Sequence, residues 1–98
     1  MNEPRESVVL FAMAMEEKLM RDELKGAWET GVGVDYLWHR AGDEMTELYE
    51  ALREYKANPT SGGRNNIMQE CTDVANFCMM IFSLFHPVAK ELKRGRRE

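Results

Sequence analysis

The sequence predicts an all-α protein: an antiparallel bundle of three main helices followed by a short C-terminal helix. Apolar residues recur at steps of three and four, which is the spacing of one helix face. Two segments rich in Gly, 26–34 and 58–63, separate the helical stretches, and such segments are typical of loops. No stretch shows the apolar–polar alternation of a strand. A chain this short buries a modest share of its surface, so self-association would stabilise it.

The first helix is expected after a loose leader, residues 1–6. Ser7 can accept a hydrogen bond as the N-cap residue. The helix should end near Lys25, because Gly26 follows and glycine commonly terminates helices. Its predicted apolar face consists of Val8, Phe11, Ala12, Met15 and Leu19.

The second helix is expected to begin after Asp35, which can cap it, and to end near Lys56. At 100° per residue, Glu44 lies within the apolar stripe of this helix and Glu47 lies at its edge. Trp38 points away from these acids, so we interpret it as a packing or subunit-interface residue. The predicted stripe consists of Leu37, Ala41, Glu44, Leu48, Ala51 and Tyr55.

The third helix is expected to begin between Arg64 and Asn66, after the Pro/Gly loop, and to continue through Ser83. Pro87 then interrupts it, and residues 88–94 can form the short final helix. Residues 93–98 are expected to be a frayed basic tail. The stripe of the third helix consists of Glu70, Asp73, Phe77, Met80, Ile81 and Leu84.

Composition limits the function classes. The chain has 98 residues, enough for one domain, and a net charge of −4, which argues against nonspecific nucleic-acid binding by the whole surface. The exception is the basic tail, which could contact phosphate or RNA or could be a frayed, solvated terminus. Cys71 and Cys78 are expected to be reduced. The N-terminus lacks a signal-peptide core and no apolar run approaches membrane-span length, so we expect a cytoplasmic protein without a membrane segment.

Two pairs of acidic residues carry the chemical hypothesis. Glu44 and Glu47 are three residues apart, as are Glu70 and Asp73, so each pair shares one helix face. An acid on an apolar stripe usually needs a partner or a metal. Four carboxylates from two packed helices would suit Mg²⁺, or alternatively Mn²⁺. The alternative is a solvated face whose acids pair with Arg40, Arg53 or Lys56.

Two further side chains extend this acidic face. Asn76 follows Asp73 by three residues and could offer its amide to a sugar hydroxyl, a phosphate or a bound water; the alternative is an ordinary amide at the edge of the core. Arg40 could pair with Glu44 at i+4 or reach a phosphate. Neither His39 nor His86 lies three residues after a Glu, which argues against a di-iron bundle site.

The stretch Glu44-x-x-Glu47-Leu48, followed after a Pro/Gly loop by Glu70-x-x-Asp73-Val74-Ala75-Asn76-Phe77, resembles the MazG-like, all-α nucleoside triphosphate pyrophosphohydrolases. That family has an ExxE helix, a variable loop and an ExxD helix. The run Lys25-Gly26-x-Trp28 also resembles the segment that precedes the ExxE helix in small members. The resemblance covers roughly residues 8–85.

The resemblance implies hydrolysis of a nucleoside triphosphate to a monophosphate and pyrophosphate, in a homodimer or homotetramer. It implies that Glu44, Glu47, Glu70 and Asp73 hold Mg²⁺, with Glu47 as the candidate acceptor of the proton of the attacking water. Lys25 would contact phosphate, or would be a cation favoured at a helix C-terminus. Trp28 would stack on the base, or would close the loop over the core. The rival interpretation is a helical nucleotide-binding or regulatory module without catalysis.

Overall fold

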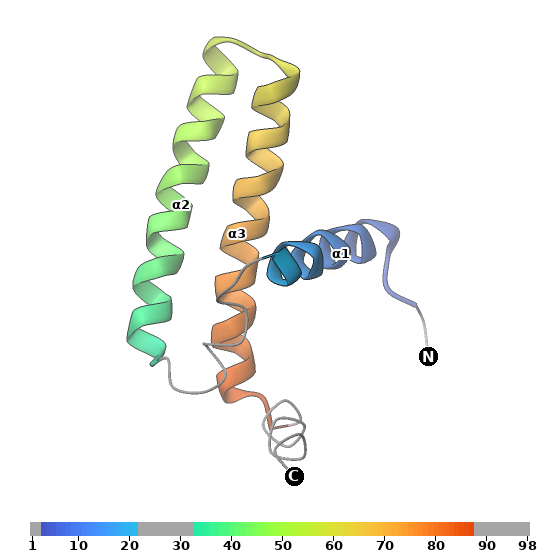
Figure 1. Ribbon diagram of the computed structural model, residues 1–98, viewed down its shortest axis with the longest axis vertical. Coiled ribbons are helices and arrows are strands. Elements are labelled where there is room, and N and C mark those ends of the chain that lie inside the picture. The colour runs from blue at the N-terminus through green and yellow to red at the C-terminus, as the bar shows by residue number, and fades with distance from the viewer. Residues whose placement is uncertain (1–2, 22–32, 88–98) are drawn as a thin grey trace.

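The computed structural model describes residues 3–21 and 33–87, and these residues form an all-helical arrangement (Figure 1). The helices are α1 (Glu6–Arg21), α2 (Val34–Ala57) and α3 (Ser61–Phe85). Helices α2 and α3 lie side by side as an antiparallel hairpin, and α1 crosses α3 (Figure 1). The all-α prediction is therefore confirmed for the described ranges, whereas the predicted short C-terminal helix lies outside them. No helix in these ranges is long and apolar enough to cross a membrane.

Helix α2 ends at Ala57, one residue beyond the predicted end, but its start differs from the prediction. The expectation that Asp35 caps the helix is wrong, because the helix begins at Val34 and Gly33 occupies the N-cap position without a side-chain hydrogen bond. Asp35 lies inside the first turn. A carboxylate there still stabilises the helix through the positive end of the helix dipole.

Helix α3 begins earlier than predicted, at Ser61 rather than at residues 64–66. Thr60 is the N-cap, and its Oγ1 accepts a 2.8 Å hydrogen bond from the Gly63 N–H. This cap explains why two glycines are tolerated in the first turn. A Cβ at Gly63 would lie 3.1 Å from the Tyr55 ring, so glycine also permits the close approach of α3 to the end of α2. The helix ends at Phe85, just before Pro87.

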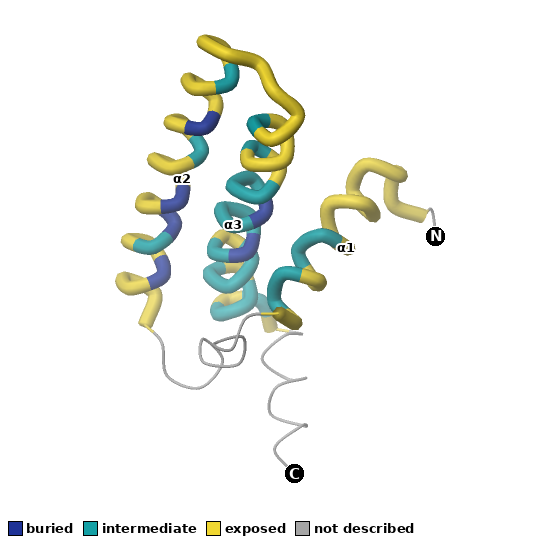
Figure 2. The backbone as a smooth tube through the Cα atoms, turned by 45° about the horizontal axis from the view of Figure 1, so that its top comes forward, coloured by how far each residue is buried: buried dark blue, intermediate teal, exposed yellow. Residues whose placement is uncertain are grey.

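The buried apolar residues lie on the side of α2 that faces α3, whereas the buried residues of α3 lie on its α1 side (Figure 2). This apolar core is small. Leu37 is 1% exposed, and two alanines, Ala41 and Ala51, accompany it. Three polar side chains are also buried: Glu44 of α2, and Thr72 and Asn76 of α3. The predicted α2 stripe thus faces α3, and one acidic residue lies within this core.

Helix α1 is attached only through its C-terminal half, and none of its residues is fully buried (Figure 2). Met15 and Leu19 are half-buried, as the predicted stripe requires. Val8 and Phe11 are 53% and 41% exposed, so the prediction that they lie on a packed face is wrong for the described structure. The N-terminal end of α1 extends past the hairpin (Figure 1).

Candidate functional site

Three carboxylates from the two long helices converge in the hairpin. Glu44 and Glu47 come from adjacent turns of α2 and Glu70 comes from α3. One oxygen of each lies within 4.8 Å of the others. We call these three side chains the carboxylate cluster. The structure therefore brings together three of the four acids singled out from the sequence.

The cluster is partly withdrawn from water. Glu44 is 6% exposed, Glu70 is half-buried and Glu47 is exposed. Burial raises the pKa of Glu44, and the negative charges of Glu47 and Asp73 raise it further, although Arg40 acts in the opposite direction. Burial is also the main cause of the raised pKa of Glu70, followed by the neighbouring carboxylates. Close like charges with few partners thus make the cluster electrostatically unfavourable.

One oxygen of the cluster has no partner. Oε1 of Glu70 is buried and forms no hydrogen bond among the described residues. A buried acceptor without a donor costs free energy, so this oxygen would gain from a cation or a donor. The arrangement offers oxygen ligands of the kind that hard divalent cations bind.

Arg40 is fixed beside the cluster by three contacts. Its Nη2 donates to Glu44 Oε2 at 3.0 Å and its Nη1 donates to Asp43 Oδ2 at 3.1 Å. The guanidinium also lies 5.1 Å from the centroid of the Phe77 ring, within the range of a cation–π interaction. The predicted pairing of Arg40 with Glu44 is confirmed, and the guanidinium orients the buried carboxylate.

Asp73 is held by a lysine of α1. Lys18 Nζ lies 2.9 Å from Asp73 Oδ1 and donates to Gln69 Oε1 at 3.1 Å. Sequence reasoning missed Lys18. The available signal was its position beside Met15 and Leu19, the two residues of the predicted α1 face that are half-buried.

Asn76 connects α3 to α1. It is 4% exposed, and its Nδ2 donates to the backbone carbonyl of Met15 at 3.3 Å. Its Oδ1 is buried without a partner among the described residues. The amide donor is thus directed to α1, as in the interpretation of Asn76 as a core amide. Lys25 and Trp28, the other candidate substrate contacts, lie outside the described residues.

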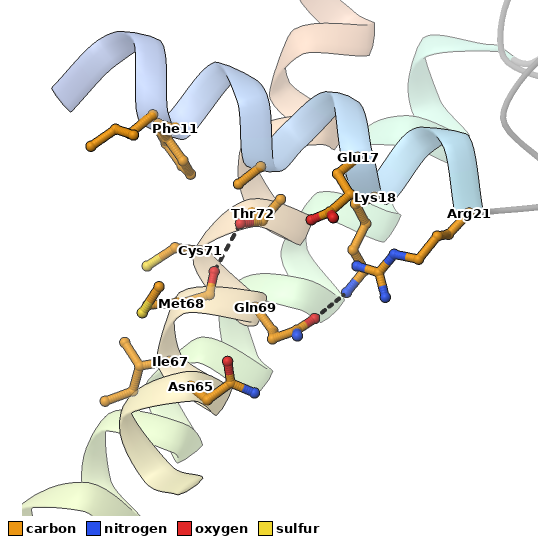
Figure 3. Close-up of a pocket in the computed structure, with 12 residues that line it drawn as sticks. Phe11, Glu17, Lys18, Arg21, Asn65, Ile67, Met68, Gln69, Cys71 and Thr72 are labelled. Atoms are coloured by element: carbon orange, nitrogen blue, oxygen red, sulfur yellow. Dashed lines mark hydrogen bonds between the residues drawn. The ribbon is translucent and has the colours of Figure 1, made fainter. Parts of the chain in front are cut away.

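A groove of about 370 Å³ runs between α1 and α3 (Figure 3), and Lys18, which pairs with Asp73, is among the residues that line it. Its size falls within the range of small-molecule sites. Apolar side chains line one part of it, and Glu17, Lys18 and Arg21 lie at the other (Figure 3). The lining includes Phe11, Met68, Thr72, Gln69, Lys18 and Arg21.

Comparison with known proteins gives no match: neither a known protein family, nor a curated protein, nor a solved structure matches the chain. The functional argument therefore depends on the geometry of the carboxylate cluster and on the sequence motifs.

The raised pKa values predict how stability depends on pH. The folded protein retains protons on Glu44 and Glu70 at pH values where the unfolded chain has lost them, above the ordinary value of 4.5. The stabilising contribution is fully present below that value and is lost as pH rises through the folded pKa. In the presence of EDTA, urea titrations across this window should give a steeper fall in the unfolding free energy for wild type than for Glu70→Gln.

Glu50→Gln is the matched control for this pH prediction, because Glu50 is an exposed glutamate of α2. Its pH profile should follow that of the wild-type protein. Parallel profiles for wild type and Glu70→Gln would contradict the electrostatic description of the cluster.

Proposed function

We propose that this chain is a Mg²⁺-dependent nucleoside triphosphate pyrophosphohydrolase of the MazG-like kind, acting in the cytoplasm. It would convert a (deoxy)nucleoside triphosphate and water to the monophosphate and pyrophosphate. The observation that carries the proposal is the convergence of Glu44, Glu47 and Glu70 within 4.8 Å, from two helices. The ExxE and ExxD spacings resemble those of that family and support the same reaction.

The residues present fit a hard divalent cation. The cluster supplies only carboxylate oxygens, and the buried Oε1 of Glu70 has no partner among the described residues. Glu44, Glu47 and Glu70 would hold Mg²⁺, and Asp73 would join them once released from Lys18. When bound, Mg²⁺ supplies charge neutralisation for phosphate oxygens and lowers the pKa of a bound water. Mn²⁺ prefers similar ligands and should substitute for it.

Two side chains, Glu47 and Arg40, would have the remaining roles in the reaction. Glu47 is the exposed member of the cluster, so its carboxylate can accept the proton of the water that attacks the α-phosphorus. The water oxygen forms a bond to that phosphorus as the bond to the bridging oxygen breaks, and pyrophosphate leaves. Arg40 keeps Glu44 oriented through the 3.0 Å hydrogen bond. Because Glu44 is already oriented, less free energy is needed to rearrange the site as charge develops in the transition state.

The direct test is product analysis. Purified protein with Mg²⁺ should release pyrophosphate and a nucleoside monophosphate from at least one member of a panel of ribo- and deoxynucleoside triphosphates. EDTA should abolish the release. Release of orthophosphate alone, or of nothing from any nucleotide, would exclude the proposed reaction.

The rival function is a catalytically silent nucleotide-binding or regulatory module, and the same assay distinguishes it from the enzyme. Such a module would release no product, yet Mg²⁺ with nucleotide would raise its melting temperature, because a ligand that binds only the folded state stabilises it. The proposed enzyme should show both product release and the shift in melting temperature.

We propose further that the active form is a homodimer or homotetramer assembled through the outer face of α2. Trp38, Met45 and Leu52 follow one another at seven-residue intervals there and are 68%, 52% and 40% exposed. This spacing forms one stripe on a helix, and a sizeable exposed apolar stripe is typical of interaction surfaces. With only three buried apolar residues among those described, a single hairpin would gain from burying this stripe.

Trp38→Glu is expected to shift the protein towards monomer, because it would place a charge in that interface. Sedimentation velocity across a concentration series measures the change. Tyr36→Glu is the matched control, since Tyr36 is 55% exposed on another side of the same helix. A monomeric wild-type protein, or an unchanged assembly of Trp38→Glu, would exclude this interface.

A further inference from the structure

Lys18 occupies an unusual position for a lysine of a peripheral helix. Its ammonium lies between two acceptors of α3, 2.9 Å from Asp73 Oδ1 and 3.1 Å from Gln69 Oε1. The side chains of Lys18 and Asp73 are only 29% and 23% exposed. The ion pair is thus partly shielded from water, where charges interact more strongly than on an open surface.

The resident cations leave part of the acidic site uncompensated. Arg40 pairs with Glu44 on one side, and Lys18 pairs with Asp73 on the other. No lysine or arginine in the described ranges forms an ion pair with Glu47 or Glu70. The negative charge of Asp73 nonetheless contributes to the raised pKa of both Glu44 and Glu70, so Asp73 belongs electrostatically to the site while its oxygen is bonded to Lys18.

Lys18 also borders the groove between α1 and α3. Its side chain lies at one part of the groove together with those of Glu17 and Arg21 (Figure 3). An ammonium released from Asp73 would remain in the same part of the groove as Arg21, a second cation, and Glu17. Lysine and arginine side chains are suited to phosphate oxygens.

We propose that Lys18 exchanges between two partners: it neutralises Asp73 when no divalent cation is bound, and it binds a phosphate of the nucleotide when the cation takes its place at Asp73. The inference rests on the proposed function, because it assumes the cation at the cluster. Cation binding then frees the phosphate contact, so cation and nucleotide bind with positive coupling. Helix α1 can shift when Lys18 changes partner, since none of its residues is fully buried.

The exchange predicts effects of opposite sign in Lys18→Met. Without nucleotide, this variant should bind Mn²⁺ roughly fivefold more tightly than wild type, because the competing ammonium is gone. With the cation present, it should bind α,β-imido deoxynucleoside triphosphates about tenfold more weakly, because a charged contact to phosphate is lost. Electron paramagnetic resonance of free Mn²⁺ measures the first affinity, and calorimetry measures the second. In turnover assays the loss should appear mainly in KM.

Lys56→Met is the charge-matched control, since Lys56 is exposed in the last turn of α2; it should change neither affinity more than twofold. Lys18→Gln should show the same two affinity shifts as Lys18→Met. Its helix content, measured by circular dichroism, should equal that of wild type and so show that the variant is folded. If wild type binds no Mn²⁺, the proposed function itself is excluded. If wild type binds Mn²⁺ but Lys18→Met lacks either shift, the exchange is excluded and the proposed function stands.

Discussion

Glu47→Gln is expected to lower kcat for pyrophosphate release by about a thousandfold, within the range that a positioned proton acceptor contributes. The substitution keeps the size of the side chain and removes the charge of the exposed member of the carboxylate cluster. Glutamine cannot accept a proton from water at neutral pH and is a weaker ligand for a divalent cation. Steady-state release of pyrophosphate at saturating Mg²⁺ and nucleotide measures the effect.

Glu50→Gln should retain wild-type turnover, because Glu50 lies on the same helix, is exposed and does not belong to the cluster. The single variant Asp73→Asn should also lose activity, because the proposed cation needs the Asp73 carboxylate once Lys18 has moved away. Turnover of Glu47→Gln within tenfold of the wild-type rate would remove Glu47 from the proposed role of proton acceptor.

Leu37→Ala is expected to destabilise the fold by about 2–5 kcal/mol, the usual cost of removing a buried leucine side chain. Leu37 is 1% exposed, and the other buried apolar residues among those described are alanines. The loss is therefore large relative to the total stability of a small domain. At about 4–8 °C per kcal/mol for a domain of this size, the melting temperature should fall by at least about 8 °C.

Leu10→Ala provides the same chemical change at a site that is 59% exposed, and its melting temperature should stay within a few degrees of wild type. Circular dichroism at a fixed protein concentration measures both variants. Equal melting temperatures for the two would mean that the α2–α3 interface does not determine the stability of the fold.

The sequence pattern predicted α2 well because this helix packs mainly against one helix of the described structure, α3. Its apolar stripe faces α3, and Glu44 is buried within the stripe as its phase required. The start of α3 was harder to predict. Two adjacent glycines indicated a loop, yet the hydrogen bond from the Gly63 N–H to Thr60 Oγ1 caps a helix that already includes them.

The contacts between α1 and α3 could not be predicted from periodicity, because they depend on how α1 crosses the hairpin. The phase of α3 places Asp73 on the acidic face, but it does not show that Lys18, fifty-five residues earlier in the sequence, bonds to it. The hydrogen bond from Asn76 to the Met15 carbonyl likewise depends on how α1 crosses the hairpin. Three of the four acids converge as the helix spacings indicated, whereas the partner of the fourth follows from tertiary packing alone.

The short connection Asn58–Thr60 between α2 and α3 has a kinetic consequence. The three carboxylates belong to these two helices alone, so the chain can assemble the cluster by closing one small loop, which costs little entropy. Structures dominated by contacts between near neighbours in sequence fold fast. We expect the hairpin to form early, with its acids already facing one another, and α1 to dock afterwards and bring Lys18 to Asp73. During folding, a cation and the docking helix α1, through Lys18, would then compete for Asp73.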